Sequence, residues 1–132
     1  MTRPSVGTDI VPVARIAALM AAAGTRFVQR WFTQAEISYC LAKAEPSRHL
    51  AARFAAKEAV VKALPPWDGP LPWRSVEIVN DARGAPTVRL TGALAEAAAR
   101  AGVGDGDIVV SLSHCDSYAT AIALVTPGGG SR

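Results

Sequence analysis

The chain has 132 residues and a formal net charge of +3, and half of its residues are hydrophobic. This length predicts one domain with its own hydrophobic core, and the longest apolar stretch is far short of the ~20 residues that a membrane-spanning helix needs. Lysine and arginine are scattered and no nucleic-acid-binding motif occurs, so we expect neither nucleic acid nor a membrane as a partner.

The first elements are predicted to be a short strand and a helix. Residues 5–10 have the composition of a strand. Pro12 then suits the first turn of a helix, because proline lacks the N–H that a helix start leaves unbonded. This helix is expected to run to about Ala23 and to stop at Gly24.

Two further helices follow. Thr33 and Glu36 have the spacing of a capping box, which predicts a helix toward Lys43. Pro46 is expected to break that helix, and Ser47 to cap the next one. This third helix is the longest, and it is expected to end at the proline pair 65–66.

The second half of the chain has mainly strand patterns. After a Pro/Trp/Gly-rich loop at 65–74, residues 76–79 and 87–90 alternate around a turn and predict a hairpin. An alanine-rich helix and two more strands are predicted at 92–101, 108–113 and 118–125. This order predicts an α+β fold, with an antiparallel sheet packed against several helices and one long central helix. We expect a single domain at 1–126 and a flexible tail at 127–132.

The two cysteines give no sign of a disulfide framework. Cys40 and Cys115 are far apart in the sequence and have no CxxC spacing, which also speaks against a zinc site. The N-terminus lacks the apolar core of a signal peptide. The expected location is therefore the cytoplasm.

The long helix carries the most informative charged group. Glu58 and Lys62 are one turn apart, and Arg53 and Lys57 lie on the adjoining strip. One carboxylate among three cations suits a metal ion held together with phosphates, but it is also the pattern of a solvated helix with an i, i+4 ion pair. The many alanines around these residues favour close approach by a ligand or another backbone.

Other candidates lie on the predicted strands and the first helix. Asp9 suits either a metal ligand or a helix cap. His114 ends the sequence Ser111-Leu112-Ser113-His114, and strand alternation places it on the opposite face from both serines. A Ser-His-Asp triad is disfavoured because no Gly-x-Ser-x-Gly elbow occurs. Arg15, Arg26 and Arg30 are either solubilising charges or a docking strip for an acidic partner.

Taken together, these segments resemble one enzyme family over about residues 5–125. The chain looks like the holo-acyl-carrier-protein synthase type of 4′-phosphopantetheinyl transferase. The resemblance rests on motifs in a fixed order, which are Gly7-x-Asp9-Ile10, Arg15, Phe27, Glu36, Arg53-Phe54-Ala55-Ala56-Lys57-Glu58-Ala59-x-x-Lys62-Ala63, Gly84-x-Pro86 and Ser111-x-Ser113-His114.

The resemblance implies the fold of that family and its reaction, which moves the 4′-phosphopantetheine group of coenzyme A to a serine of an apo carrier protein and releases 3′,5′-ADP. It implies that Asp9 and Glu58 bind Mg²⁺ and that Glu58 helps to deprotonate the serine. Lys62 would stabilise the departing phosphate. The remaining contacts with coenzyme A phosphates would come from Arg53, Lys57 and His114.

Partners also follow from the resemblance. The carrier would be an acidic helical protein of fatty-acid, polyketide or peptidyl type, docked on Arg15 and Arg26, and a chain of this size would form a homotrimer. The loop 65–74 and Ala85 depart from the family pattern. Two alternatives remain, a coenzyme A or carrier-protein binding module of the same fold without turnover, and a Mg²⁺-dependent phosphohydrolase of another fold.

Overall fold

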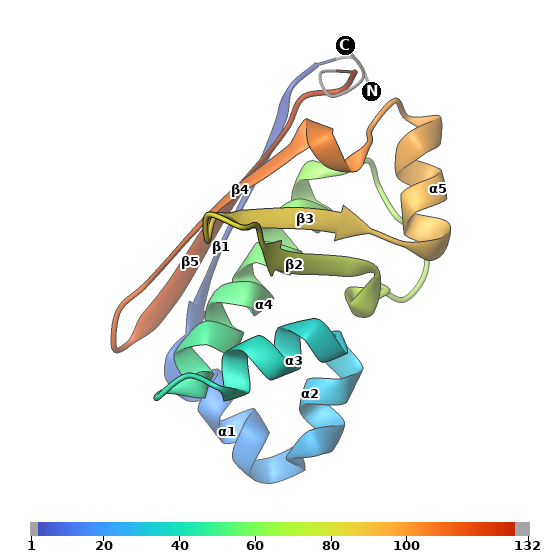
Figure 1. Cartoon of the computed structure of the whole chain (residues 1–132). Helices are drawn as coiled ribbons and strands as arrows, with labels where there is room; N and C mark the ends of the chain where they lie inside the picture. The colour runs from blue at the N-terminus through green and yellow to red at the C-terminus, as the bar shows by residue number, and fades with distance from the viewer. Residues whose placement is uncertain (1–2, 129–132) are drawn as a thin grey trace.

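A computed structural model describes residues 3–128 as an α+β fold with two antiparallel sheets (Figure 1). The larger sheet has three strands in the order β1–β5–β4, with bounds Ser5–Pro12 for β1, Tyr118–Val125 for β5 and Ile108–His114 for β4. The register pairs Asp9 with Ala121 and His114 with Ala119. The fold class predicted from the sequence is confirmed, with the strands divided between two sheets.

The helix α4 (Pro46–Ala63) packs along the inner face of the three-stranded sheet. Its buried residues occur on almost every side of the helix, which is typical of a helix enclosed by the core. Six of its alanines are buried, and the inward positions of β5 are the small residues Ala119, Ala121 and Ala123. Small side chains on both surfaces let the helix and the sheet approach closely, which positions the residues that they carry.

Three short helices pack beneath the sheet, as Figure 1 shows. They are α1 (Val13–Ala23), α2 (Thr25–Trp31) and α3 (Gln34–Leu41). The sequence did not predict α2. Gly24, at φ 55°, both ends α1 and precedes the first residue of α2, so a single glycine separates two helices and no side-chain cap marks the second.

Two predicted helix boundaries differ from the structure. Pro46 does not end α3, which already stops at Leu41, but occupies the first turn of α4. Ser47 therefore lies inside α4 rather than capping it, and the N-cap position is Glu45. Pro12 is the last residue of β1, and α1 begins after it. The capping box of Thr33 and Glu36 is confirmed.

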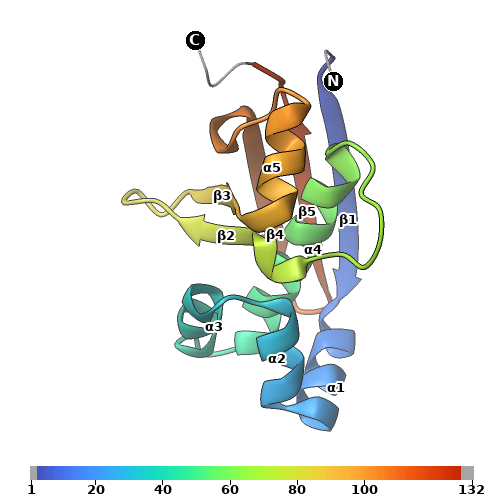
Figure 2. The same ribbon diagram turned by 90° about the vertical axis from the view of Figure 1, so that its right-hand side faces the viewer.

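The remaining elements lie around α4. The hairpin of β2 (Val76–Asn80) and β3 (Pro86–Leu90) crosses in front of α4 in Figure 1, and β3 lies against β4. Short 3₁₀ segments at Trp73–Ser75 and Asp105–Asp107 precede β2 and β4. The helix α5 (Gly92–Arg100) lies across α4 from the three-stranded sheet (Figure 2). Of the helices within residues 3–128, none has the length and apolar character needed to cross a bilayer. Within the predicted tail, 129–132 fall outside the described residues.

The outer face of the three-stranded sheet is apolar and uncovered in the single chain. Its exposed aliphatic side chains are those of Val6, Ile10, Val109, Ile122 and Leu124. The register places all five on the face opposite to α4, because directly paired residues share a face and alternate residues change face. An apolar face of this kind is typical of a surface that binds another protein.

Candidate active site

Asp9 and Glu58 are brought together where β1 lies on α4. The side chain of Asp9 is 12% exposed, and its Oδ2 atom is buried without a hydrogen-bond partner in the described part of the chain. Lys62 Nζ lies 3.1 Å from the other oxygen, Oδ1, and 3.0 Å from the carbonyl oxygen of Thr8. The expected ion pair between Glu58 and Lys62 is therefore replaced by one between Lys62 and Asp9. Asp9 also does not cap α1, whose N-cap is Pro12.

The charge balance at Glu58 favours proton uptake. Partial burial raises the pKa of the Glu58 carboxyl, and the neighbouring charge of Asp9 raises it further. The positive charges of Lys62 and Arg15 lower the same pKa, so both side chains are close enough to interact electrostatically with Glu58. A carboxylate whose pKa is moved toward neutral pH is better suited to accept a proton from a hydroxyl.

The pair also fits a hard divalent cation. Mg²⁺ is usually bound by only one or two carboxylates, with the other ligands supplied by substrate phosphates and waters. Two adjacent carboxylates, one with a buried and unpartnered oxygen, match that donor set. Residues 3–128 contain no group of three or more Asp, Glu, His and Cys side chains that could enclose a metal. Substrate phosphates and waters are the usual sources of the remaining ligands of such a cation.

Arg53 and His114 belong to a separate group, which we call the Tyr39 cluster and define as Tyr39, Lys43, His49, Arg53 and His114. The Arg53 guanidinium lies 4.1 Å from the Tyr39 ring centroid, and Lys43 Nζ lies 4.5 Å from it. The His49 ring is 5.1 Å from that of His114 and 6.2 Å from that of Tyr39. Within one chain, β5 lies between β4, which carries His114, and β1, which carries Asp9.

The Tyr39 cluster contains a histidine that the sequence reasoning missed. His49 is four residues before Arg53 on α4, so the helical spacing could have identified it. Burial and the nearby positive groups, first among them His114, lower the pKa of His49. Arg53 itself is buried, donates to Asn80 Oδ1 at 3.3 Å, and has an Nε atom without a partner in the described residues.

Lys57 lies in neither group. Its side chain is fully buried, and its ammonium lies 2.7 Å from Glu36 Oε1. The same ammonium donates to the carbonyl oxygens of Trp73 and Val76. These three acceptors occupy its three protons, so in this structure Lys57 has no donor left for a phosphate. The capping-box spacing predicts a role for Glu36 at the start of α3, but it does not predict this ion pair with Lys57.

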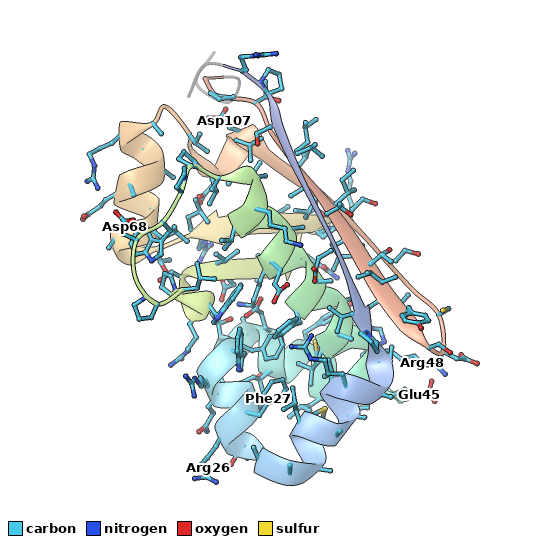
Figure 3. All side chains as sticks on the ribbon, turned by 180° about the vertical axis from the view of Figure 1, so that it is seen from behind. Arg26, Phe27, Glu45, Arg48, Asp68 and Asp107 are labelled. Carbon is cyan, nitrogen blue, oxygen red and sulfur yellow. The ribbon has the colours of Figure 1, made fainter. Side chains whose placement is uncertain are left out.

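Arg15 and Arg26 both face solvent on the helices beneath the sheet. The Arg15 guanidinium is 5.6 Å from the ring centroid of Phe54. Arg26 points away from α2 while Phe27 points inward, as Figure 3 shows. Arg26 lines an open groove of about 340 Å³ whose other walls are Leu19, Ala23, Phe27, Arg30 and Trp31. The groove combines positive charge with apolar contact area.

Comparison with known proteins gives a consistent match. The model of the 4′-phosphopantetheinyl transferase superfamily matches residues 5–123. The chain is 44% identical over 120 residues to a holo-[acyl-carrier-protein] synthase of Protochlamydia amoebophila, covering 90% of this chain and 94% of the relative. It is 45% identical over 119 residues to the enzyme of that name from Moorella thermoacetica, covering 90% and 91%.

Solved structures agree with the sequence matches. A complex of this type of synthase with coenzyme A from Chronobacterium ammoniagenes superposes with a TM-score of 0.81 at 29% identity, covering 94% of this chain and 97% of that one. The coenzyme A complex of the Helicobacter pylori synthase gives a TM-score of 0.77 at 30% identity, covering 91% and 98%.

Proposed function

The chain belongs to the 4′-phosphopantetheinyl transferase superfamily, in its holo-acyl-carrier-protein synthase type, and from that premise we propose the reaction that it catalyses. It transfers the 4′-phosphopantetheine group of coenzyme A to a serine of an apo acyl carrier protein and releases 3′,5′-ADP. The observation that carries this proposal is the meeting of Asp9 and Glu58 beside Lys62. The named relatives and the two coenzyme A complexes support the choice of substrates.

Asp9 and Glu58 are proposed to hold Mg²⁺ together with the coenzyme A pyrophosphate. The unpartnered Oδ2 of Asp9 and the shortage of further carboxylates fit a cation that completes its shell with phosphate oxygens. When bound, the ion would neutralise charge on the pyrophosphate and so favour attack by a hydroxyl.

The side chains of this site supply the proton transfer and the charge balance. In the reaction, the serine oxygen forms a bond to the phosphorus that bears pantetheine, and the bond from that phosphorus to the bridging oxygen breaks. Glu58 accepts the proton of the serine hydroxyl. Lys62, whose side chain is 55% exposed, holds the negative charge that develops on the 3′,5′-ADP.

The Tyr39 cluster is proposed to anchor coenzyme A phosphates through Arg53 and His114, with Lys43 adding positive charge. The partnerless Nε of Arg53 and the three basic side chains at the Tyr39 ring, those of Lys43, His49 and Arg53, support this role. Lys57 is left out of the set because its protons are used inside the protein. One coenzyme A molecule would then have its nucleotide end on a Tyr39 cluster and its pyrophosphate on Asp9 and Glu58. The Tyr39 cluster and the two carboxylates must therefore belong to one site.

A homotrimer would meet that demand. We propose that the outer face of the three-stranded sheet, with Val6, Ile10, Val109, Ile122 and Leu124, is covered by neighbouring copies. The Tyr39 cluster of one copy would then lie beside the carboxylates of the next. Burial of this apolar face is the driving force for such an assembly.

The acyl carrier protein is proposed to dock on Arg15 and Arg26, beside the groove of α1 and α2. Arg15 influences Glu58 and so lies at the edge of the reacting groups, whereas Arg26 lies farther along the helices. Cationic side chains beside apolar contacts suit an acidic amphipathic helix. The reaction is proposed to take place in the cytoplasm.

The test is direct. The purified protein is incubated with Mg²⁺, coenzyme A and an apo carrier of fatty-acid, polyketide or peptidyl type, and the carrier is weighed by mass spectrometry. We expect a gain of one phosphopantetheine group, which disappears when a chelator removes Mg²⁺. If coenzyme A binds but no carrier of any type gains mass, the protein is a binding module rather than a transferase.

A further inference from the structure

A small, open cavity lies beside Glu58 and Lys62 and is not used by the steps above. It has a volume of about 180 Å³ and is lined by Glu58, Val61, Lys62, Leu71 and Trp73. Glu58 and Lys62 form its polar edge, whereas the other three residues make an apolar wall. One side of the cavity therefore belongs to α4, and the other to the segment between α4 and β2.

Trp73, which forms part of the apolar wall, is held in place by contacts with side chains of α2 and α4. The Trp73 ring lies 4.7 Å from the ring of Trp31 and 6.2 Å from that of Phe54, measured between centroids. The carbonyl oxygen of Trp73 accepts a hydrogen bond from Lys57 Nζ at 2.8 Å, and Lys57 is paired with Glu36 in the core. The side chain and the backbone of Trp73 are thus fixed independently, which gives the cavity a preformed shape.

The chemistry of coenzyme A suggests what enters this space. The transferred phosphate is joined to a methylene group, and the next carbon is quaternary and carries two methyl groups. Beyond it the arm bears a hydroxyl and two amides, which need hydrogen-bond partners. The geminal dimethyl group is hence the bulkiest apolar part of the arm, and it is two bonds from the oxygen on the reacting phosphorus.

We propose that this cavity receives the geminal dimethyl group of the phosphopantetheine arm and that Trp73 determines this specificity. The inference rests on the proposed function, because it places the reacting phosphate at Glu58 and Lys62. An apolar wall next to those two residues is within reach of the dimethyl carbon when the phosphate is in place. Contact with this wall would fix the orientation of the arm relative to the phosphate, and it would also favour coenzyme A over compounds without the dimethyl group.

The experiment compares coenzyme A with an analogue in which both pantoyl methyl groups are replaced by hydrogen. Transfer is measured at saturating carrier, and the affinity of each compound is measured by calorimetry. For the wild-type protein we expect kcat/KM to fall by about tenfold or more with the analogue, the lower end of what a lost apolar contact costs in a hydrophobic pocket. In Trp73→Ala this difference between the two compounds should largely vanish.

The matched control is Trp67→Ala. Trp67 lies in the same loop but lines a different cavity, with Leu64 and Leu94, so its removal should leave the discrimination unchanged. If Trp73→Ala does not fold, Leu71→Ala removes part of the same wall, and it should reduce the discrimination as well.

Three results would overturn the proposal. The wild-type protein could treat both compounds alike, or Trp73→Ala could keep the full difference. Trp73→Ala could also raise KM for the carrier while leaving the ratio of the two compounds intact, which would assign the cavity to the carrier. If the wild-type protein transfers nothing, the proposed function fails separately, and the calorimetric affinities of the two compounds still decide the occupant of the cavity.

Discussion

Gly7 of β1 is in backbone contact with Ala59 of α4. A Cβ atom on Gly7 would lie 2.0 Å from the carbonyl oxygen of Ala59, a separation that no real side chain could adopt. The strand therefore lies on the helix without a side chain between them. Asp9 is two residues after Gly7 on the same face of β1, and Glu58 precedes Ala59, so this contact brings the two carboxylates together.

Substitution of Gly7 by alanine should disrupt the fold and the site together. The new methyl group would have to push β1 away from α4, and because the obstacle is backbone we expect a loss of about 3 kcal/mol, the upper end for overpacking. The measurement is the free energy of unfolding in urea. Gly104→Ala is the control, because its Cβ would lie 3.9 Å from the nearest atom. Equal stabilities for the two variants would contradict the close contact.

The glycine and the small residues of α4 explain how much of the site could be predicted from the sequence. The motif order named Asp9, Glu58 and Lys62 as candidates, which the structure brings close together, and the alanines of α4 indicated close packing. The partner of Lys62, however, could not be predicted. Lys62 pairs with a residue 53 positions away because β1 lies on α4, and local spacing favours Glu58 instead. Long-range contacts of this kind leave no local pattern.

The same limit applies to Lys57 and to α2. The position of a lysine on a helix does not show whether its side chain faces solvent or a buried glutamate. Here the partner of Lys57 is Glu36, which lies 21 residues earlier on another helix. The helix α2 has seven residues and no side-chain cap, so the usual start signals are missing. The strands and α5, by contrast, were predicted to within a few residues, because alternation and turn residues are local.

Removal of either carboxylate should abolish transfer while leaving the fold intact. Glu58→Gln should lower kcat by about 100-fold or more, the usual contribution of a general base. Asp9→Asn should cause a loss of similar size through weaker Mg²⁺ binding, which calorimetry with coenzyme A present would detect. Asp68→Asn, which changes an exposed carboxylate of the loop, is the control. Wild-type rates for either site variant at limiting Mg²⁺ would refute the metal assignment.

Charge reversal at Arg26 should weaken binding of the carrier rather than of coenzyme A. Arg26→Glu replaces attraction by repulsion at an exposed position, so KM for the carrier should rise about tenfold and the effect should shrink with added salt. Arg15→Glu should raise KM for the carrier as well, with an added change in kcat because Arg15 also influences Glu58. Arg100→Glu on α5 makes the same change in net charge elsewhere and should have no effect on KM for the carrier. Equal changes in both KM values would count against the docking strip.

Stability should fall as the pH drops below about 6.5, in part because of His49. The folded protein lowers the pKa of His49, first by burial and then through His114, Lys43, Arg53 and Arg48, so below the ordinary value of 6.5 the unfolded chain binds the extra proton more readily. Protonation thus favours unfolding. His49→Phe removes this contribution and should flatten the decline between pH 7.5 and 5.5 in urea titrations. An unchanged slope would show that His49 titrates normally in the folded protein.

Lys57 and Glu36 should behave as a coupled structural pair. Burial lowers the pKa of Lys57, whereas Glu36 opposes that change, and both side chains are fully buried. Glu36 also accepts hydrogen bonds from the backbone N–H groups of Thr33 and Ile78, so the pair connects α3, α4 and β2. Lys57→Met leaves a buried carboxylate without its cation, and we expect a loss of about 3–5 kcal/mol in the free energy of unfolding.

A double-mutant cycle distinguishes this role from a direct contact with coenzyme A. Glu36→Gln alone should also be strongly destabilising. The loss in the free energy of unfolding for the double variant Glu36→Gln with Lys57→Met should be smaller than the sum of the two single losses by about 1 kcal/mol or more, because the second change removes a charge that has already lost its partner. Urea unfolding of the four proteins gives the coupling. If Lys57 instead bound a coenzyme A phosphate, Lys57→Met would keep the wild-type stability and raise KM for coenzyme A, and it would add nothing to the loss caused by Glu36→Gln.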